Sequence, residues 1–116
     1  MLIVNSPCNP TGICYPEDQL RGLAELCERH SICLVSDEIY SRFVYDGPHL
    51  SAARWNEQAL VIDGFSKSWG MTGWRVGWMV VPDGLIRSVE RLAQNLYISP
   101  PAVAQVAALG AFDGMD

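Results

Sequence analysis

Short apolar runs alternate along this chain with polar turns and amphipathic segments, a pattern typical of an α/β fold. Residues 1–4 form an apolar run that ends in Asn, Pro and Gly residues, which predicts a buried strand followed by a turn. Between residues 16 and 30, apolar side chains recur at helical spacing, with acidic residues in the first turn and basic residues in the last. Residues 32–35 form a second apolar run. We therefore expect a strand, a helix and a parallel strand joined by a right-handed crossover.

The second half of the chain predicts two further strands and two helices. Residues 60–62 indicate a strand, and the polar residues 41–58 before it are expected to be irregular or partly helical. Residues 74–81 are also strand-like. Only about ten residues separate these two strands, too few for a helical crossover, so we expect the last strand to be antiparallel. Helical spacing predicts a helix over residues 83–96, and an alanine-rich helix follows over residues 102–114.

Composition and charge narrow the classes of function. The 116 residues are 49% hydrophobic and 18% charged, which is ordinary for a globular core. A net charge of −5 argues against a nucleic-acid surface, which needs clustered basic residues. No apolar run approaches the roughly 20 residues of a bilayer span, and the N-terminus does not have the pattern of a secretory signal. We therefore predict a cytoplasmic protein with reduced thiols.

The cysteines and histidines do not form a metal-binding pattern. The cysteines are Cys8, Cys14, Cys27 and Cys33. None of them forms a C-x-x-C pair, and His30 and His49 lie in unrelated contexts. We expect no metal site, assign no role to His49, and expect Cys27 and Cys33 to face the core.

Lys67 is the only lysine of the chain, and it lies among aromatic and small residues in the stretch DGFSKSWGMTGWRVG. A lysine that can lose its proton is a nucleophile for carbonyl carbons, with which it forms a Schiff base. A phosphate-binding P-loop is excluded, because that motif requires glycine directly before the lysine and Ser66 stands there.

Three polar side chains follow three of the predicted strands: Asn9, Asp37 and Lys67. Ligands of open parallel sheets gather beyond the carboxyl ends of the strands. Tyr40 lies three residues after Asp37, where a helical turn would place both side chains on one face. Arg75 adds a permanent cation. Amine, carboxylate, hydroxyl, amide and guanidinium groups together match the aldehyde, ring nitrogen, ring oxygen and phosphate of pyridoxal 5′-phosphate.

Each of these residues also has a simpler interpretation. Asp37 could cap a helix, and Asn9 could serve only as a turn residue. Tyr40 could lie at the edge of the core, and Arg75 could form a surface ion pair. We expect Glu38 to point away from this set and to be structural. The tryptophans near the lysine are expected to pack rather than to stack on a cofactor: Trp69, Trp74 and Trp78.

The stretch GFSKSWGMTGWRVG, residues 64–77, closely resembles the lysine signature of class I/II aminotransferases, which are pyridoxal-phosphate enzymes of fold type I. The sequences NPTG at residues 9–12 and SDEIY at residues 36–40 resemble two further markers of that family, in the same order. The resemblance covers essentially the whole chain. It implies an α/β fold in which residues 1–116 form part of the large cofactor-binding domain, a partial three-layer sandwich around a mostly parallel sheet with a last antiparallel strand.

The resemblance implies a role for each candidate residue. Lys67 would form the Schiff base with pyridoxal 5′-phosphate and move the substrate proton, and Asp37 would pair with the ring nitrogen. Asn9 and Tyr40 would contact the ring 3-oxygen, and Arg75 would contact the phosphate.

Ser66 and Gly64, two positions near the lysine, also bear on the resemblance to the family. Ser66 would contact the phosphate or orient the lysine. Gly64 stands where the family often has serine, which removes one hydroxyl from the expected phosphate site.

The implied reaction is the transfer of an amino group between an amino acid and a 2-keto acid, in a homodimer. Nothing in the residues selects the amino donor. The family's phosphate loop, ring-stacking aromatic and substrate-binding arginine are not assignable, so we expect this chain to be a fragment of the large domain. Two alternatives stay open: a non-catalytic remnant or interaction module of this fold, and a carbon–sulfur lyase or cyclopropane-forming synthase that uses the same cofactor.

Overall fold

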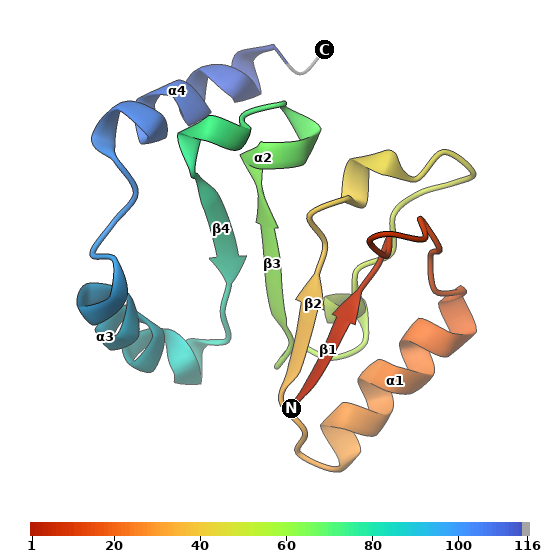
Figure 1. Cartoon of the computed structure of the whole chain (residues 1–116). Helices are drawn as coiled ribbons and strands as arrows, with labels where there is room; N and C mark the ends of the chain where they lie inside the picture. Colours follow the sequence, from red (N-terminus) through yellow and green to blue (C-terminus); the bar gives the residue numbers. More distant parts are fainter. Residues whose placement is uncertain (115–116) are drawn as a thin grey trace.

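A computed structural model describes residues 1–114 and contains a four-stranded sheet flanked by helices (Figure 1). The strands are β1 (Leu2–Asn5), β2 (Leu34–Asp37), β3 (Leu60–Gly64) and β4 (Gly77–Val80). They lie side by side in chain order, with β1, β2 and β3 parallel and β4 antiparallel to β3. The predicted α/β class, with a mostly parallel sheet and a last antiparallel strand, is confirmed.

The strands do not keep the bounds of the apolar runs that predicted them. β2 begins at Leu34 instead of residue 32 and ends in the acidic residues after the run, because its ladder with β1 continues to the pair Asn5 and Asp37. β3 extends beyond residue 62 to Gly64. β4 begins at Gly77 instead of Trp74. Residues 72–74 form one turn of 3-10 helix, and Arg75 adopts a left-handed conformation with a φ of 57°, which interrupts extended backbone.

The helices are α1 (Glu17–Arg29), α2 (Phe65–Ser68), α3 (Ile86–Leu96) and α4 (Ala102–Asp113). α1, α3 and α4 correspond to the three predicted helices, whereas the short helix α2, which carries Lys67, was not predicted. Single turns of 3-10 helix lie at Ser41–Phe43, Ala52–Arg54, Thr72–Trp74 and Asp83–Leu85. The polar connector before β3 is therefore partly helical, as predicted. Among residues 1–114, none of the helices is both long and apolar enough to cross a membrane.

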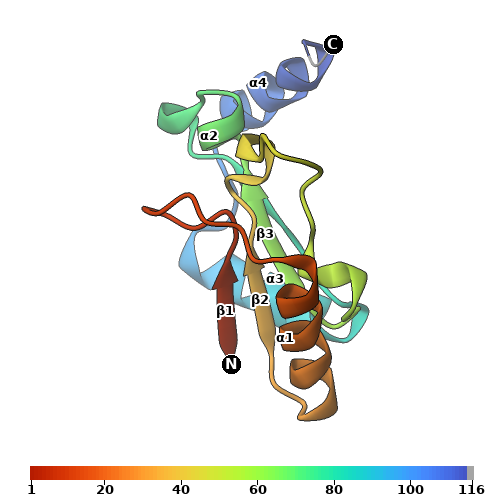
Figure 2. The ribbon, with the colours of Figure 1, turned by 90° about the vertical axis from the view of Figure 1, so that its right-hand side faces the viewer.

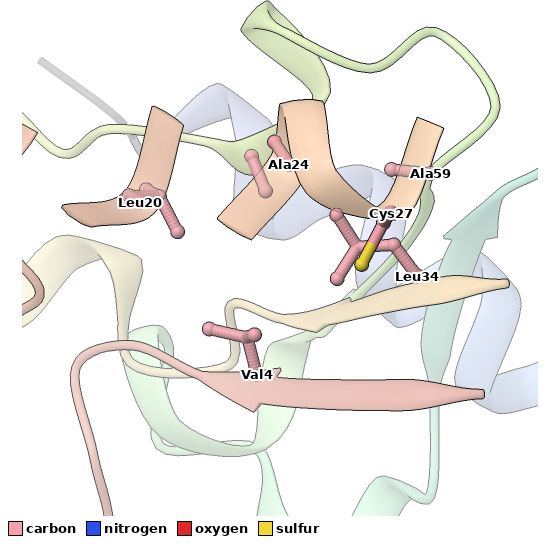
Figure 3. Packing of buried hydrophobic residues seen from close by; sticks show 7 residues of the cluster. Val4, Leu20, Ala24, Cys27, Leu34 and Ala59 are labelled. Carbon is pink, nitrogen blue, oxygen red and sulfur yellow. The ribbon is translucent and has the colours of Figure 1, made fainter. Parts of the chain in front are cut away.

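The first hydrophobic cluster lies between α1 and one face of the sheet (Figures 2 and 3). It contains Val4, Leu20, Ala24, Cys27, Leu34, Ala52 and Ala59. The prediction that Cys27 faces the core is confirmed, since it is fully buried. The same prediction for Cys33 is wrong, because Cys33 is exposed. Leu34 faces the core, and successive side chains of an extended segment point to opposite sides.

A second cluster lies between α2 and α4 and includes Phe65, Val76, Ala104 and Ala108. Three aromatic rings surround Phe65: those of Trp69, Trp78 and Phe112 lie 4.9, 5.1 and 5.2 Å from its ring centroid. Trp69 and Trp78 therefore pack against protein, as expected. The third tryptophan, Trp74, is 43% exposed and lies in the turn before β4. This cluster joins the C-terminal helix to the segment that carries Lys67.

β3 and β4 approach each other most closely at Gly64 and Gly77. A Cβ atom on Gly64 would lie 3.0 Å from Cα of Gly77 and 3.1 Å from the carbonyl oxygen of Val76. A Cβ atom on Gly77 would lie 2.8 Å from the carbonyl oxygen of Asp63. These neighbours are backbone atoms, which cannot move aside as a side chain can. The close approach therefore leaves little room for a side chain at position 64, where the resemblance leads one to expect serine.

We predict that Gly77→Ala lowers the free energy of unfolding of the chain by about 1–3 kcal/mol, because the added methyl group overpacks a backbone contact. Chemical denaturation followed by circular dichroism measures this change. The matched control is Gly22→Ala in α1, where a Cβ atom meets no atom within 4 Å. This control should be unchanged or more stable by about 0.5–1 kcal/mol. Equal stability of Gly77→Ala and wild type would contradict the close approach.

Candidate active site

The carboxyl ends of β1, β2 and β3 meet at one edge of the sheet (Figure 1). Asn5 pairs with Asp37, and Asp37 pairs with Ile62. The ladder continues one residue further, since the Ser6 N–H donates to the Asp37 carbonyl at 3.2 Å and the Glu38 N–H donates to the Ile62 carbonyl at 2.8 Å. The segments that carry Asn9, Asp37 and Lys67 therefore all leave the sheet at this edge.

Tyr40 contacts two of the predicted site residues. The Asn9 Nδ2 donates to the Tyr40 hydroxyl at 3.3 Å. The Lys67 Nζ lies 5.8 Å from the centroid of the Tyr40 ring, within the range of a cation–π contact. Asn9 and Tyr40 also line one cleft of about 400 Å³, together with Phe43 and Tyr45. The structure thus brings together Asn9, Tyr40 and the exposed Lys67 from three separate segments.

Asp37 is the last residue of β2 and is half-buried. Its Oδ1 accepts a hydrogen bond from the Ile39 N–H at 3.3 Å, an arrangement in which aspartate closes a turn of its own backbone. Asp37 and Tyr40 are therefore joined by a turn that leads into the 3-10 helix Ser41–Phe43. The helical turn that we considered for this pair is not formed.

Arg75 and Ser66 are placed differently from the other candidates. The exposed Arg75 donates from Nη1 to the Thr72 carbonyl at 2.9 Å. It lines a cleft of about 520 Å³ that also contains Asp63 and Tyr97 but neither Asn9 nor Tyr40. Ser66 is half-buried at the second position of α2, directly before Lys67. The structure therefore does not bring the guanidinium group into the cleft of Asn9 and Tyr40.

Asn5 is a positioning residue that the sequence analysis missed. Its Oδ1 accepts from the Asn9 N–H at 2.7 Å, and its Nδ2 donates to the Asp37 carbonyl at 3.3 Å. One amide side chain therefore ties the loop of Asn9 to the strand of Asp37. A sequence signal was present, because an amide at the end of an apolar run must find partners for both its donor and its acceptor.

Glu38, the neighbour of Asp37, is buried and accepts several hydrogen bonds. Its Oε1 accepts from the hydroxyls of Ser36 at 2.8 Å and Ser51 at 2.6 Å, and its Oε2 lies 2.8 Å from Nε2 of His49. Burial raises the pKa of Glu38, but the hydrogen bonds from His49, Ser51 and Ser36 outweigh burial and hold the pKa below its usual value. This geometry agrees with the expectation that Glu38 has a structural role. His49, to which the sequence analysis assigned no role, is one of the partners of Glu38.

Asp63 makes a similar connection from β3. Its Oδ1 accepts from the Gly64 N–H at 2.6 Å, and its Oδ2 accepts from the Ser41 hydroxyl at 3.2 Å. Burial raises the pKa of Asp63, and these two hydrogen bonds offset only part of that effect. Ser41 directly follows Tyr40, so Asp63 links β3 to the turn that carries Tyr40. The sequence analysis named no role for Asp63 or Ser41.

We predict that Glu38→Gln lowers the free energy of unfolding at pH 7 by about 1–3 kcal/mol, because it removes a buried charged acceptor. The folded-state pKa of Glu38 lies below its usual value of 4.5. Its stabilisation is therefore fully present above that value and is lost as the pH falls through the folded-state pKa.

Denaturation of wild type and Glu38→Gln at a series of pH values tests this prediction. The difference between the two proteins should narrow below pH 4.5, the usual pKa of Glu38. Asp63, whose folded-state pKa is raised, has the opposite pH dependence. Burial is the main cause of that shift and is common to both proteins, whereas the smaller contribution from the Glu38 charge is removed in Glu38→Gln, so most but not all of the effect of Asp63 cancels in the difference. The control Glu25→Gln, at an exposed position of α1, should have little effect. A difference that stays constant down to pH 3, well below 4.5, would contradict the prediction.

Comparison with known proteins identifies the family. The chain matches the model of aminotransferase class I and II over residues 1–116. Aspartate aminotransferase of Bacillus subtilis is 42% identical, over 97% of this chain and 30% of that protein. Valine–pyruvate aminotransferase of Mycobacterium tuberculosis is also 42% identical, over 96% of this chain and 29% of that protein.

Solved structures agree with this match. The aspartate aminotransferase of Thermus thermophilus with maleate superimposes with a TM-score of 0.89 at 41% identity, over 94% of this chain and 29% of the other. This agreement confirms the α/β arrangement of fold type I. The chain thus spans about 30% of the length of the relatives that it matches. It belongs to the class I and II aminotransferases, the family of pyridoxal-phosphate enzymes that its lysine signature resembles.

Proposed function

We propose that residues 1–116 form the part of an aminotransferase large domain that carries the reactive lysine, and that Lys67 is that lysine. The observation that supports this proposal best is the convergence on Tyr40, which lies 3.3 Å from the Asn9 amide and has its ring 5.8 Å from Lys67 Nζ. The proposed reaction moves an amino group between an α-amino acid and a 2-keto acid.

The residues at this edge of the sheet fit pyridoxal 5′-phosphate by their chemistry. An amine suits its aldehyde, a carboxylate suits its ring nitrogen, and a hydroxyl and an amide suit its ring oxygen. Lys67, Asp37, Tyr40 and Asn9 supply these groups from segments that leave the sheet at the same edge. Arg75 would have to exchange its hydrogen bond with the Thr72 carbonyl for one with the phosphate.

When it is bound, pyridoxal 5′-phosphate supplies an aldehyde for amines and a ring that withdraws electrons from the substrate α-carbon. In our proposal the Lys67 amine removes the proton from that α-carbon, acting as a general base. The Asp37 carboxylate holds a proton at the ring nitrogen. Asn9 and Tyr40 bind the 3-oxygen, Arg75 binds the phosphate, and Ser66 orients Lys67 or binds the phosphate with its hydroxyl.

The proposal also covers the amino donor, the oligomeric state and the cellular location. The relatives are named for aspartate and for valine with pyruvate, so the amino donor is proposed only as an α-amino acid. A homodimer is proposed from the family resemblance. The exposed apolar side chains of α3 and α4, among them Leu92, Leu96, Val103 and Val106, offer a surface that the rest of the large domain or a second subunit would cover. A cytoplasmic location is supported by the four cysteines, all of which are unpaired.

We predict that incubation with pyridoxal 5′-phosphate followed by borohydride reduction attaches the cofactor covalently to Lys67. Lys67 is the only lysine, so the only competing amine is the N-terminus. Because trypsin does not cut after a modified lysine, the adduct should appear in the peptide of residues 55–75 instead of 55–67. Mass spectrometry of the tryptic peptides distinguishes these two products.

Two variants control this experiment. Lys67→Arg keeps the positive charge but removes the primary amine, and it should lose the adduct completely. Asp37→Asn keeps Lys67, so it should still be labelled if the lysine itself is accessible. Labelling of the N-terminus alone in the wild-type chain would refute the proposal and would favour a non-catalytic remnant of this fold.

We further predict that Tyr40→Phe weakens binding of pyridoxal 5′-phosphate about 2- to 10-fold, because one hydrogen bond contributes roughly 0.5–1.5 kcal/mol and 1.4 kcal/mol corresponds to a factor of ten. Titration followed by the absorbance of the cofactor measures the dissociation constant. The matched control is Tyr15→Phe, since Tyr15 lines a different cleft. If both variants bound the cofactor as tightly as wild type, the Tyr40 hydroxyl would not be part of the site.

A further inference from the structure

Two cysteines enclose the loop that carries Asn9. Cys8 precedes Asn9 and is partly exposed, and Cys14 lies at the end of the loop and is exposed. Both line one cleft of about 360 Å³, together with Thr11 and Ile13. Neither thiol has a role in the function proposed above.

The backbone of this loop brings the two cysteines close together. The Cys8 N–H donates to the Ile13 carbonyl at 2.9 Å, and the Gly12 N–H donates to the Cys8 carbonyl at 2.7 Å. The Ile13 carbonyl carbon is bonded to the nitrogen of Cys14. The hydrogen bond from the Cys8 N–H to this carbonyl therefore places the backbone of Cys14 beside the backbone of Cys8. A disulfide needs Cα atoms about 4.4–6.8 Å apart, which a loop closed in this way allows without a large backbone movement.

The other two cysteines are poor partners for this pair. Cys27 lies on α1 and is fully buried in the cluster between that helix and the sheet. Cys33 precedes β2 and its carbonyl accepts from the Leu2 N–H at 2.9 Å, which places it at the amino end of β1. Cys8 follows the carboxyl end of β1, at the opposite edge of the sheet. Within the chain, Cys8 and Cys14 are therefore the pair that can react with each other.

We propose that Cys8 and Cys14 form a reversible disulfide when the chain meets an oxidant of the peroxide class. The thiolate of the exposed Cys14 attacks one oxygen of the peroxide; an S–O bond forms, the O–O bond breaks, and hydroxide leaves and is protonated to water. The thiolate of Cys8 then attacks the Cys14 sulfur; the S–S bond forms, the S–O bond breaks, and a second hydroxide leaves as water. Two thiols and one peroxide thus give one disulfide and two waters.

This disulfide would close a covalent ring over residues 8–14. Asn9 lies inside this ring, and its side chain reaches the Tyr40 hydroxyl at 3.3 Å. The ring would therefore restrict the loop that presents the Asn9 amide at the edge of the sheet. The modification site depends only on the two thiols and the backbone between them, so it stands apart from the cofactor proposal.

Tryptic peptide mapping tests the proposal sharply, because the cleavage sites separate the cysteines. Cleavage at Arg21, Arg29 and Arg42 places Cys8 and Cys14 in the peptide of residues 1–21, Cys27 in residues 22–29 and Cys33 in residues 30–42. The folded full chain is treated with hydrogen peroxide, then denatured, alkylated and digested. We expect the peptide of residues 1–21 to lose both alkylations and to be two hydrogen atoms lighter than its unalkylated reduced form. Dithiothreitol added before alkylation should restore both sites.

Three variants complete the design. Cys33→Ser, the matched control, should form the same product as wild type. Cys8→Ser and Cys14→Ser should each abolish it, and circular dichroism verifies that they are folded. The proposal is overturned if the peptide of residues 1–21 keeps two free thiols, if it becomes linked to the peptide of Cys33 or to a second chain, or if its cysteines are oxidised only to sulfinic or sulfonic acids.

Discussion

The register of the three parallel strands determines where the candidate site residues lie. Asn5, Asp37 and Ile62 form one row across β1, β2 and β3. A slip of one residue in β2 would turn Asp37 to the other face of the sheet and move the buried Leu34 out of the core, because side chains alternate along a strand. Burial of Leu34 and Val4 under α1 opposes this slip. The hydrophobic core under α1 therefore aligns the polar edge, although none of its residues belongs to that edge.

Side chains at this edge then fix the loops that leave it. Asn5 holds the loop of Asn9, Glu38 holds the connector through Ser51 and His49, and Asp63 holds the turn of Tyr40 through Ser41. The carboxylates of Glu38 and Asp63 differ in how far their hydrogen bonds offset the effect of burial on the pKa. Three partners lower the pKa of Glu38 despite burial, whereas the pKa of Asp63 is raised because burial exceeds its hydrogen bonds. The hydrogen bonds thus stabilise the ionised form of Glu38. Asp63 links β3 to the turn of Tyr40, but its hydrogen bonds do not fully offset the cost of burying its charge.

The sequence predicted those parts of the structure that follow from the local spacing of apolar and polar residues. Helical spacing located α1, and the order of apolar runs placed Asn9, Asp37 and Lys67 at one edge. The start of β4 was wrong because Trp74 to Val76 has the composition of a strand, yet the left-handed Arg75 interrupts it. The contacts of Glu38 with Ser51 and His49 were not predictable, since they depend on the path of a connector that has no periodicity. Asn5, by contrast, was missed although its position at the end of an apolar run was a usable signal, and its partners lie on the neighbouring strand and in the turn that follows its own strand.

The position of Lys67 depends on packing that lies far away in the sequence. The chain leaves β3 at Gly64 and returns at Gly77, and the two glycines pair across the ladder. Phe65 and Val76 close this excursion, since the Phe65 N–H donates to the Val76 carbonyl at 3.2 Å, and both side chains are buried against α4. The helix at the end of the chain therefore fixes the backbone two residues before Lys67. Arg75, at the other end of the same excursion, is exposed and held by one hydrogen bond to a carbonyl, which a stronger anionic acceptor can replace. This segment between Gly64 and Gly77 thus combines an exposed lysine that closely follows the buried Phe65 with an exposed arginine whose side chain can exchange its acceptor.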